Sequence, residues 1–299
     1  MTLRIILVDS TRGEFFLAGF SALLLLLTTG TSFFMVAFII QSAFPTLGSL
    51  IDLWPRLTGG IWSPLTEPPV FGFLHAWTST LIVAAIALFL AIPLGVSMAL
   101  FTTEVAPPRI SAIARQGIEI LAGIPAVVYG FVGFVVLLPA IESLFDLPAG
   151  ETLLAAGLIL AIMILPYIAS VSSDAFNTVP ADMRIAAMAY GVSQFYVIRK
   201  VTLPKALSGV FAGVVLGLAR VIGETLAVTM LAGNALSVPT SVLDRGQPLT
   251  ALIATELGEA GVGSAMYEAI FSAGALLMIL VIAINLLFWR LKNWVSHDA

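Results

Sequence analysis

The chain has 299 residues, of which 60% are hydrophobic and 10% are charged, and its mean hydropathy is +1.08. A water-soluble domain does not need so much apolar surface, so this composition predicts a helical membrane protein with several spans. The formal net charge of −4 is small, and the absence of cysteine excludes disulfides, thiolate metal sites and cysteine nucleophiles. The two histidines, His75 and His297, are far apart, so we expect no histidine-based metal cluster and no cofactor.

Six apolar runs are long enough to cross a bilayer. They lie at about residues 15–44, 76–101, 117–141, 152–172, 209–233 and 264–289. The first run exceeds the apolar core of a cleaved signal peptide, so we expect a permanent span there. The sequence therefore predicts an all-α integral membrane protein with six transmembrane helices.

Polar segments rich in proline and glycine divide these runs into three parts. Residues 1–75 would comprise an N-terminal tail, the first transmembrane helix and an outer loop. Residues 76–292 would form the main transmembrane domain, with a long polar loop at 173–208, and residues 293–299 would be a C-terminal tail. Residues 234–263 contain several Pro and Gly residues and predict a second outer loop.

The distribution of basic residues predicts the orientation. With the N-terminus inside, ten of the 13 Lys and Arg residues lie in inner segments, and only Arg56 and Arg245 lie outside. Because cytoplasmic loops carry the excess of positive charge, both termini and the 173–208 loop are expected in the cytoplasm.

The remaining basic residue, Arg220, lies within the fifth run together with Glu224. A charge at bilayer depth costs at least about 2.5–3.5 kcal/mol on insertion scales, so it needs compensation. On one continuous helix these two residues share a side, together with a stripe of small residues at Gly209, Gly213 and Gly217. The far side would carry Phe211, Val215, Leu218, Ile222 and Leu226. We expect the charged side to face neighbouring helices or a central path.

This pair has two interpretations, which are compatible with each other. In the first, Arg220 transiently binds an oxyanion through charge-assisted hydrogen bonds, and Glu224 competes for the guanidinium so that the anion is released. In the second, the two residues form a structural ion pair that fixes helix packing. The sequence leaves both open.

The inner loop at 173–208 predicts two short helices joined at a glycine. A small-residue helix around Ala186 and Ala187 would end at Gly191, since glycine is the common residue after a helix end. Ser193 can cap a second helix over residues 194–201, which we expect to end at Leu203-Pro204.

This loop resembles the permease signature of ABC importers. Ala186-Ala187, then Gly191, then Val201-Thr202-Leu203-Pro204 have that family's spacing, although Ile185 stands where the family usually has Glu. The resemblance implies that the loop docks a short coupling helix onto an ATPase subunit, and the departure at Ile185 removes an ionic contact that this position could otherwise supply.

Further motifs resemble the C-type (PstC-type) permease subunit of bacterial phosphate importers. They are the string Arg220-Val-Ile-Gly223-Glu224-Thr225, residues 119–130 and residues 249–260, and the likeness covers about residues 60–292. The resemblance implies a permease in the bacterial plasma (inner) membrane that forms half of a translocation path by alternating access. It also implies that Arg220 and Glu224 take part in phosphate passage.

The same resemblance implies four kinds of neighbour: a homologous A-type permease, two ATPase subunits, an extracytoplasmic phosphate-binding protein and the lipid bilayer. The chain has no Walker A sequence, so we expect a transport subunit and not an enzyme, with ATP hydrolysed on another polypeptide. Two alternatives remain open. One is a permease for another oxyanion such as sulfate or molybdate, and the other is a self-sufficient channel or secondary transporter.

Overall fold

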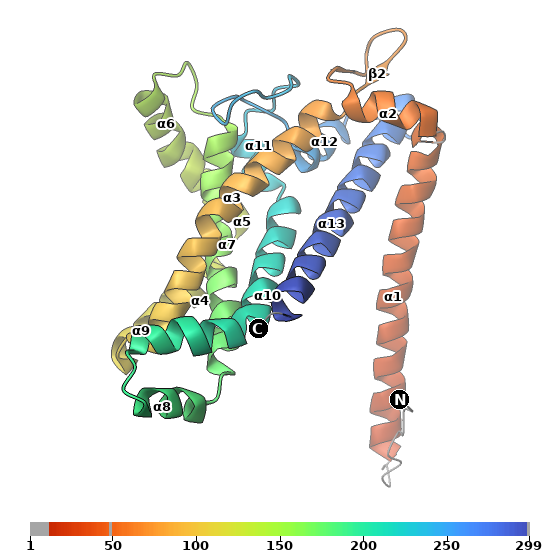
Figure 1. The fold of residues 1–299 in the computed structure, drawn as a ribbon. Coiled ribbons are helices and arrows are strands. Elements are labelled where there is room, and N and C mark those ends of the chain that lie inside the picture. Colours follow the sequence, from red (N-terminus) through yellow and green to blue (C-terminus); the bar gives the residue numbers. More distant parts are fainter. Residues whose placement is uncertain (1–11, 48–49, 298–299) are drawn as a thin grey trace.

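The computed structural model describes residues 12–47 and 50–297, and helices dominate this part of the chain (Figure 1). Six of its helical stretches are long and apolar enough to cross a membrane, which confirms the expected number of spans. They are Leu17–Ala43, Leu74–Val105, Ala126–Phe145, Leu153–Asn177, Gln194–Ile222 and Ala265–Arg290.

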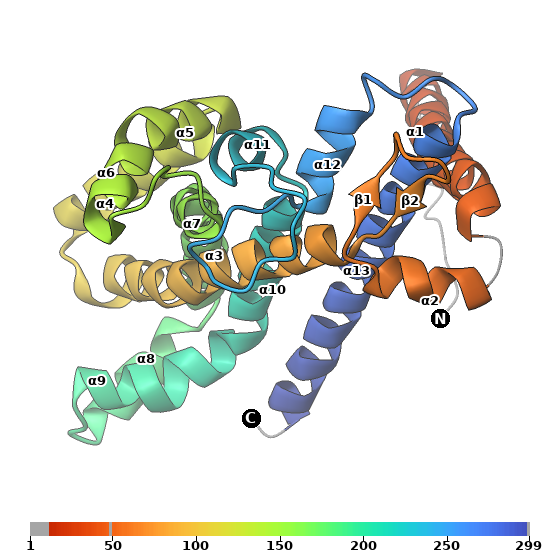
Figure 2. The same cartoon turned by 90° about the horizontal axis from the view of Figure 1, so that it is seen from above.

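Helix α7 (Leu153–Asn177) forms the centre of the bundle. The buried share of its most apolar stretch, 61%, is the highest among the six spans. Viewed from above it appears end-on, close to α3 (Leu74–Leu100) and α5 (Ala126–Val132) (Figure 2). Small residues permit the close approach: a Cβ on Gly157 of α7 would lie 2.6 Å from the Ile86 side chain, and one on Gly95 of α3 would lie 2.9 Å from that of Ile168.

Helix α1 (Arg12–Leu47) stands apart from this bundle and packs on α13 (Ala265–His297) toward one end (Figure 1). The ring of Phe38 meets that of Phe271 edge-on, with centroids 5.5 Å apart. None of the most apolar stretch of α1 is buried within this chain. Its long apolar surface is therefore available to lipid or to another membrane helix.

The two ends of the molecule differ. One end carries α8 (Ala181–Ala189) and α9 (Gln194–Val197), and we call it the loop end. The opposite end, which we call the hairpin end, carries α2 (Leu50–Thr58) and the hairpin of β1 (Trp62–Ser63) and β2 (Val70–Phe71) (Figure 1). There Trp62 and Phe73 pack with centroids 5.7 Å apart, next to residues of α12 (Leu249–Glu256) and α13.

The third span differs from its predicted position at residues 117–141. A separate helix, α4 (Pro108–Gly123), ends before an extended break at Ile124-Pro125. The span then continues through α5, the π-helical segment η2 (Gly133–Leu137) and α6 (Leu138–Phe145). Because proline has no N–H and disfavours a helical conformation in the preceding residue, the break falls at this dipeptide.

The fifth span was also predicted wrongly, at both of its ends. Leu203-Pro204 does not end a helix, because α9 continues through the π-helical segment η3 (Ile198–Thr202) into α10 (Leu203–Ile222). Such a widened turn is a common way for a helix to accommodate a local disruption. At the other end α10 stops before Gly223-Glu224-Thr225, and the short helix α11 (Leu226–Leu231) begins after it.

The predicted outer loop at 234–263 contains the buried helix α12. Leu249, Ala251 and Leu252 have no exposed surface, and the α12 main chain is fixed by a bond from the Leu249 amide to the Thr80 hydroxyl, 3.0 Å long. The flanking Pro and Gly residues conceal a helix of only eight residues, which is too short to stand out as a span. The other spans agree with their predicted positions.

Candidate functional site

Arg220 lies in the last turn of α10, where its positive charge is favoured by the helix dipole. The side chain is half-buried and its guanidinium carbon stands 4.5 Å above the centroid of the Tyr167 ring of α7. Its Nε is buried without a hydrogen-bond partner. A cation over a desolvated aromatic face gains about 0.5–2 kcal/mol, which is less than the cost of placing the charge at bilayer depth.

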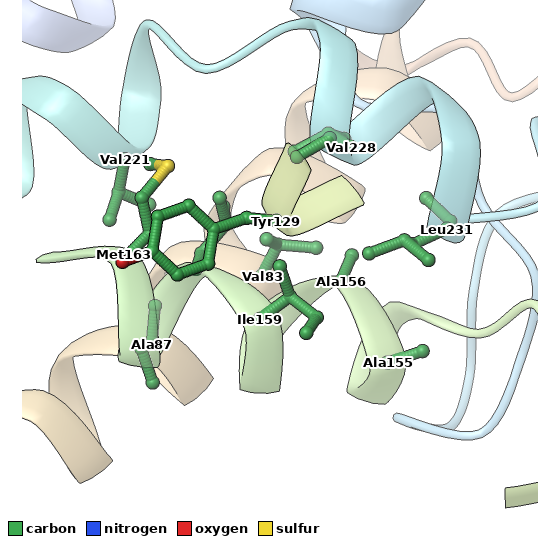
Figure 3. Packing of buried hydrophobic residues seen from close by; sticks show 14 of the residues in the cluster. Val83, Ala87, Tyr129, Ala155, Ala156, Ile159, Met163, Val221, Val228 and Leu231 are labelled. Atoms are coloured by element: carbon green, nitrogen blue, oxygen red, sulfur yellow. The ribbon is translucent and has the colours of Figure 1, made fainter. Parts of the chain in front are cut away.

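Tyr167 beneath the guanidinium and Tyr129 of α5 both donate hydrogen bonds to the end of α4. The Tyr167 hydroxyl donates to the Ala122 carbonyl at 3.1 Å, and the Tyr129 hydroxyl donates to the Leu121 carbonyl at 2.8 Å. Both acceptors belong to the last turn of α4, where carbonyls lack the usual helical partner four residues on, and the Leu121 carbonyl also accepts from the Ile124 amide just beyond the helix. The Tyr129 ring packs in the apolar core with Met163 and Val221 (Figure 3), so this tyrosine serves packing and capping.

Glu224 does not pair with Arg220. Among residues 17–43 and 54–290, whose side chains the structure describes, only Arg184 and Glu104 come within ion-pair distance, so the structural ion pair of the second interpretation is not formed. The helix break at Gly223 takes Glu224 out of the α10 register. Its Oε1 instead accepts a hydrogen bond from the Ala227 amide, 3.2 Å away, at the start of α11.

Sequence reasoning missed Tyr167 and Thr250 at this site. The Thr250 hydroxyl of α12 donates to the Glu224 carbonyl at 2.8 Å and so ties the break to the hairpin end. Tyr167 follows Pro166 inside an apolar span, and only its place one residue after a helix proline could have drawn attention to it. The contact with Arg220 joins segments that are 53 positions apart, and no local pattern predicts it.

The glycine stripe of α10 packs as expected. A Cβ on Gly209 would lie 2.4 Å from that of Ala175, and one on Gly217 would lie 3.0 Å from the Ile168 side chain, both on α7. The side of α10 that carries Arg220 thus faces the central helix. The opposite side is only partly exposed, since Leu218 and Ile222 are buried as well.

The residues predicted to couple the chain to an ATPase lie at the loop end. Ala186 is exposed and Ala187 is half-buried on α8, while Gly191 takes a left-handed φ of 76° between α8 and α9. Leu203 packs against the buried cluster around Phe176, and Pro204 lies in the first turn of α10. The five residues therefore divide into three on or just after α8, exposed except for the half-buried Ala187, and two half-buried residues where α10 begins.

The outer face of α8 and α9 is apolar and open. The exposed large side chains there include Ile185 (61%), Tyr190 (88%) and Phe195 (69%). The water-exposed surface of a protein seldom carries a group of large apolar side chains, and exposed apolar patches of this kind mark interaction sites. The architecture is that of a six-span helical membrane protein with an interior cation and a projecting two-helix loop at one end.

The chain belongs to the family described as binding-protein-dependent transport system inner membrane component, whose model matches residues 91–297. It is 34% identical to the probable ABC transporter permease protein YqgH of Bacillus subtilis over 286 residues, covering 96% of this chain and 92% of that protein. It is 36% identical to the phosphate transport system permease protein PstC of Mesorhizobium japonicum over 247 residues, covering 76% of this chain and 75% of the relative.

Solved ABC importers share the fold. A bacterial alginate ABC transporter bound to its periplasmic protein aligns with a TM-score of 0.65 at 15% identity, covering 96% of this chain and 99% of that chain. The inward-facing MetNI methionine transporter aligns with a TM-score of 0.57 at 21% identity, covering 73% of this chain and 93% of that chain. At these identities the likeness concerns the fold alone.

Family membership fixes the chain's general role. It is a multi-pass protein of the bacterial inner membrane and the permease component of an ABC importer. An importer of this family implies a substrate-binding protein and an ATPase as partners, so ATP is hydrolysed on a separate subunit and this chain is not itself an enzyme.

Proposed function

We propose that this chain is the permease subunit of an ATP-driven inorganic phosphate importer and forms half of its translocation path by alternating access. Several relatives named as phosphate transport permeases, at 33–37% identity, support the choice of substrate. The permease domain would comprise residues 76–292, with the coupling loop at 173–208, and the family match over residues 91–297 supports most of that range.

The observation that carries the proposal is the state of Arg220. This guanidinium lies inside a helical bundle, half-buried, and no carboxylate of the described residues comes within 4.0 Å of it. An unpaired charge at this depth must be stabilised by something other than an ion pair, and the Tyr167 ring offsets only part of the cost. A guanidinium that is not committed to a carboxylate can give two hydrogen bonds to an oxyanion.

Glu224 would act beside the anion and not as the resting partner of Arg220. Its carboxylate caps α11 and its carbonyl accepts from Thr250, so it connects the helix break to α12. A negative charge close to the path disfavours tight anion binding, and transport requires that the anion leaves as readily as it enters. We therefore assign Glu224 to release and to the position of the break.

The partners follow from the same proposal. A homologous A-type permease would supply the other half of the path, and an extracytoplasmic phosphate-binding protein would deliver the anion at the hairpin end. Two ATPase subunits would drive the cycle, with one of them receiving the coupling loop. Ala186, Ala187 and Gly191 would allow close approach there, and the exposed apolar side chains of α8 and α9 support such a contact.

The direct test is anion-stimulated ATP hydrolysis by the assembled complex in liposomes, measured with its binding protein present. Phosphate should stimulate hydrolysis and be taken up, whereas sulfate and molybdate should not. Stimulation by sulfate or molybdate but not by phosphate would identify another oxyanion permease and overturn the choice of substrate.

A second assay addresses the remaining alternative. The purified chain alone in liposomes should move no phosphate, since the proposed path has only one of its two halves. Phosphate flux without ATP or partners would instead identify a self-sufficient channel or secondary transporter.

A further inference from the structure

The loop end contains a polar cluster that the proposed function does not use. Glu104 lies in the π-helical segment η1 (Phe101–Val105), which continues α3. Its side chain is 6% exposed, and its Oε1 lies 3.0 Å from the Nη2 of Arg184 on α8, whose side chain is 20% exposed. Among residues 17–43 and 54–290, whose side chains the structure describes, it is the one ion pair, and it joins residues distant in sequence.

Two further bonds extend this cluster to other helices. Arg184 Nη2 also donates to the Phe176 carbonyl, 2.5 Å away, near the end of α7. The Gln194 side-chain amide, at the first residue of α9, donates to the Glu104 carbonyl. Arg184 therefore holds α8 to both α3 and α7, and Glu104 contacts both helices of the loop, α8 through the ion pair and α9 through its carbonyl. We call Glu104, Arg184, Gln194 and the Phe176 carbonyl the loop tether.

Helix α8 depends on this tether because little else holds it. None of its residues is buried, and several of its apolar side chains point outward. Gly191 follows it in a left-handed conformation, and no side chain or main chain would contact a Cβ at that position. A helix attached only at its covalent ends would pivot there when a partner pushed on it. A short, largely desolvated ion pair resists such a motion far better than an exposed one.

We propose that the loop tether makes α8 move as one body with α3 and α7, so that displacement of the coupling loop reaches the centre of the bundle. Helix α7 leads from Phe176 to Tyr167, nine residues and about 14 Å along the axis, and Tyr167 contacts Arg220. Glu104 and Arg184 are thus positioning residues for the transport cycle. The inference rests on the proposed function, because it needs an ATP-driven motion of the loop.

The test uses the assembled complex with Arg184→Met and Glu104→Gln, both of which remove one charge. Arg109→Met and Glu119→Gln are matched controls, since both residues are exposed on the neighbouring α4. Uptake per assembled complex should fall at least tenfold in the tether variants while ATP hydrolysis continues, so that more ATP is hydrolysed for each phosphate transported. The controls should keep the wild-type ratio, and the Glu104→Gln/Arg184→Met double variant should be no worse than either single variant.

A role in folding alone would lower total uptake and total ATP hydrolysis together, in proportion to the amount of complex. Uptake per assembled complex would then stay at the wild-type level, and that result would overturn the inference. Failure of the proposed function would look different, because the wild-type complex itself would then show no phosphate-stimulated hydrolysis.

A second measurement leaves the tether intact and does not depend on how its variants assemble. Because the chain has no cysteine, spin labels can be placed at Met188→Cys on α8 and Asp174→Cys on α7, both of which are exposed. The distance between the labels should be the same in the nucleotide-free and ATP-bound complexes. A change between those two states would show that α8 pivots independently, and it would contradict the proposal.

Discussion

Two half-buried arginines of this chain have opposite environments. Arg184, at the loop end, lies 3.0 Å from a carboxylate and also donates to a main-chain carbonyl. Arg220, inside the bundle, lies over an aromatic ring, and no described carboxylate comes within ion-pair distance. A paired arginine holds two elements together, whereas an unpaired one remains available for a ligand. The comparison assigns anchoring to the first and anion binding to the second.

The largest effect should come from removing the unpaired charge. Arg220→Ala should reduce phosphate uptake about 100-fold, because charge-assisted hydrogen bonds contribute about 1.5–3 kcal/mol and about 1.4 kcal/mol corresponds to a factor of ten. Uptake should be normalised to the amount of assembled complex, with Arg220→Lys as the control that keeps the charge and loses the planar fork. Full uptake by an assembled Arg220→Ala complex would remove Arg220 from the path.

The aromatic partner of Arg220 should matter less than the charge. Tyr167→Leu removes the ring beneath the guanidinium and should reduce uptake about tenfold, within the range of about 0.5–2 kcal/mol expected for this interaction. Tyr167→Phe keeps the ring and loses only the bond to Ala122, so it should transport nearly as well as the wild type. Equal losses in the two variants would show that the hydroxyl, and not the ring, positions Arg220.

A substitution at Gly191 tests how α8 is anchored without changing any charged residue. Gly191→Ala places a side chain at a φ of 76°, which costs about 1–2 kcal/mol although nothing crowds the added Cβ. The strain should loosen the α8–α9 connection, with a modest loss of coupling and normal anion binding. ATP hydrolysed per phosphate transported is the measurement, and a change in anion affinity would argue against a purely mechanical role.

The smallest effect should come from Asp244, whose carboxylate is bound by main-chain amides and not by an arginine. Hydrogen bonds from the Thr240 amide, the Ser241 amide and the Thr240 hydroxyl lower the pKa of Asp244 below its ordinary value of 3.8. The ionised Asp244 carboxylate therefore stabilises the turn at residues 240–244 above pH 3.8. This stabilisation is lost as the pH falls through the lowered pKa.

Amide hydrogen exchange measures this local effect. In Asp244→Ala the amides at Thr240 and Ser241 should exchange faster than in the wild type at neutral pH, while transport should barely change because the turn is exposed. The difference should shrink at acid pH. Equal exchange in the two proteins at neutral pH would show that the turn does not depend on the carboxylate.

The spans were predictable because each one carries its signal locally. A run of about twenty apolar residues is long enough to cross the bilayer, and four of the six spans lie close to their predicted positions. The breaks were harder to predict. Pro125 interrupts a helix and Pro204 does not, although both lie in largely apolar segments. The difference depends on whether the preceding helix can widen into a π-helical turn, which accommodates the carbonyl left without a donor by the proline.

The candidate site was only half predictable. The sequence identified Arg220 and Glu224 as costly interior charges and predicted that the small-residue side of the helix packs closely on a neighbour. It also predicted a resting geometry, one continuous helix with both charges on one side, that Gly223 and Thr225 interrupt. Tyr167, Thr250 and Glu104 escaped notice because their roles depend on contacts between distant segments.

By itself, the sequence determined that this chain crosses the membrane six times and that a positive charge lies within one span, since hydrophobicity and charge act residue by residue. Only the tertiary structure decided which arginine has a carboxylate partner. Ion pairing requires two groups within about 4 Å, and that distance depends on where helices break and which of them pack together.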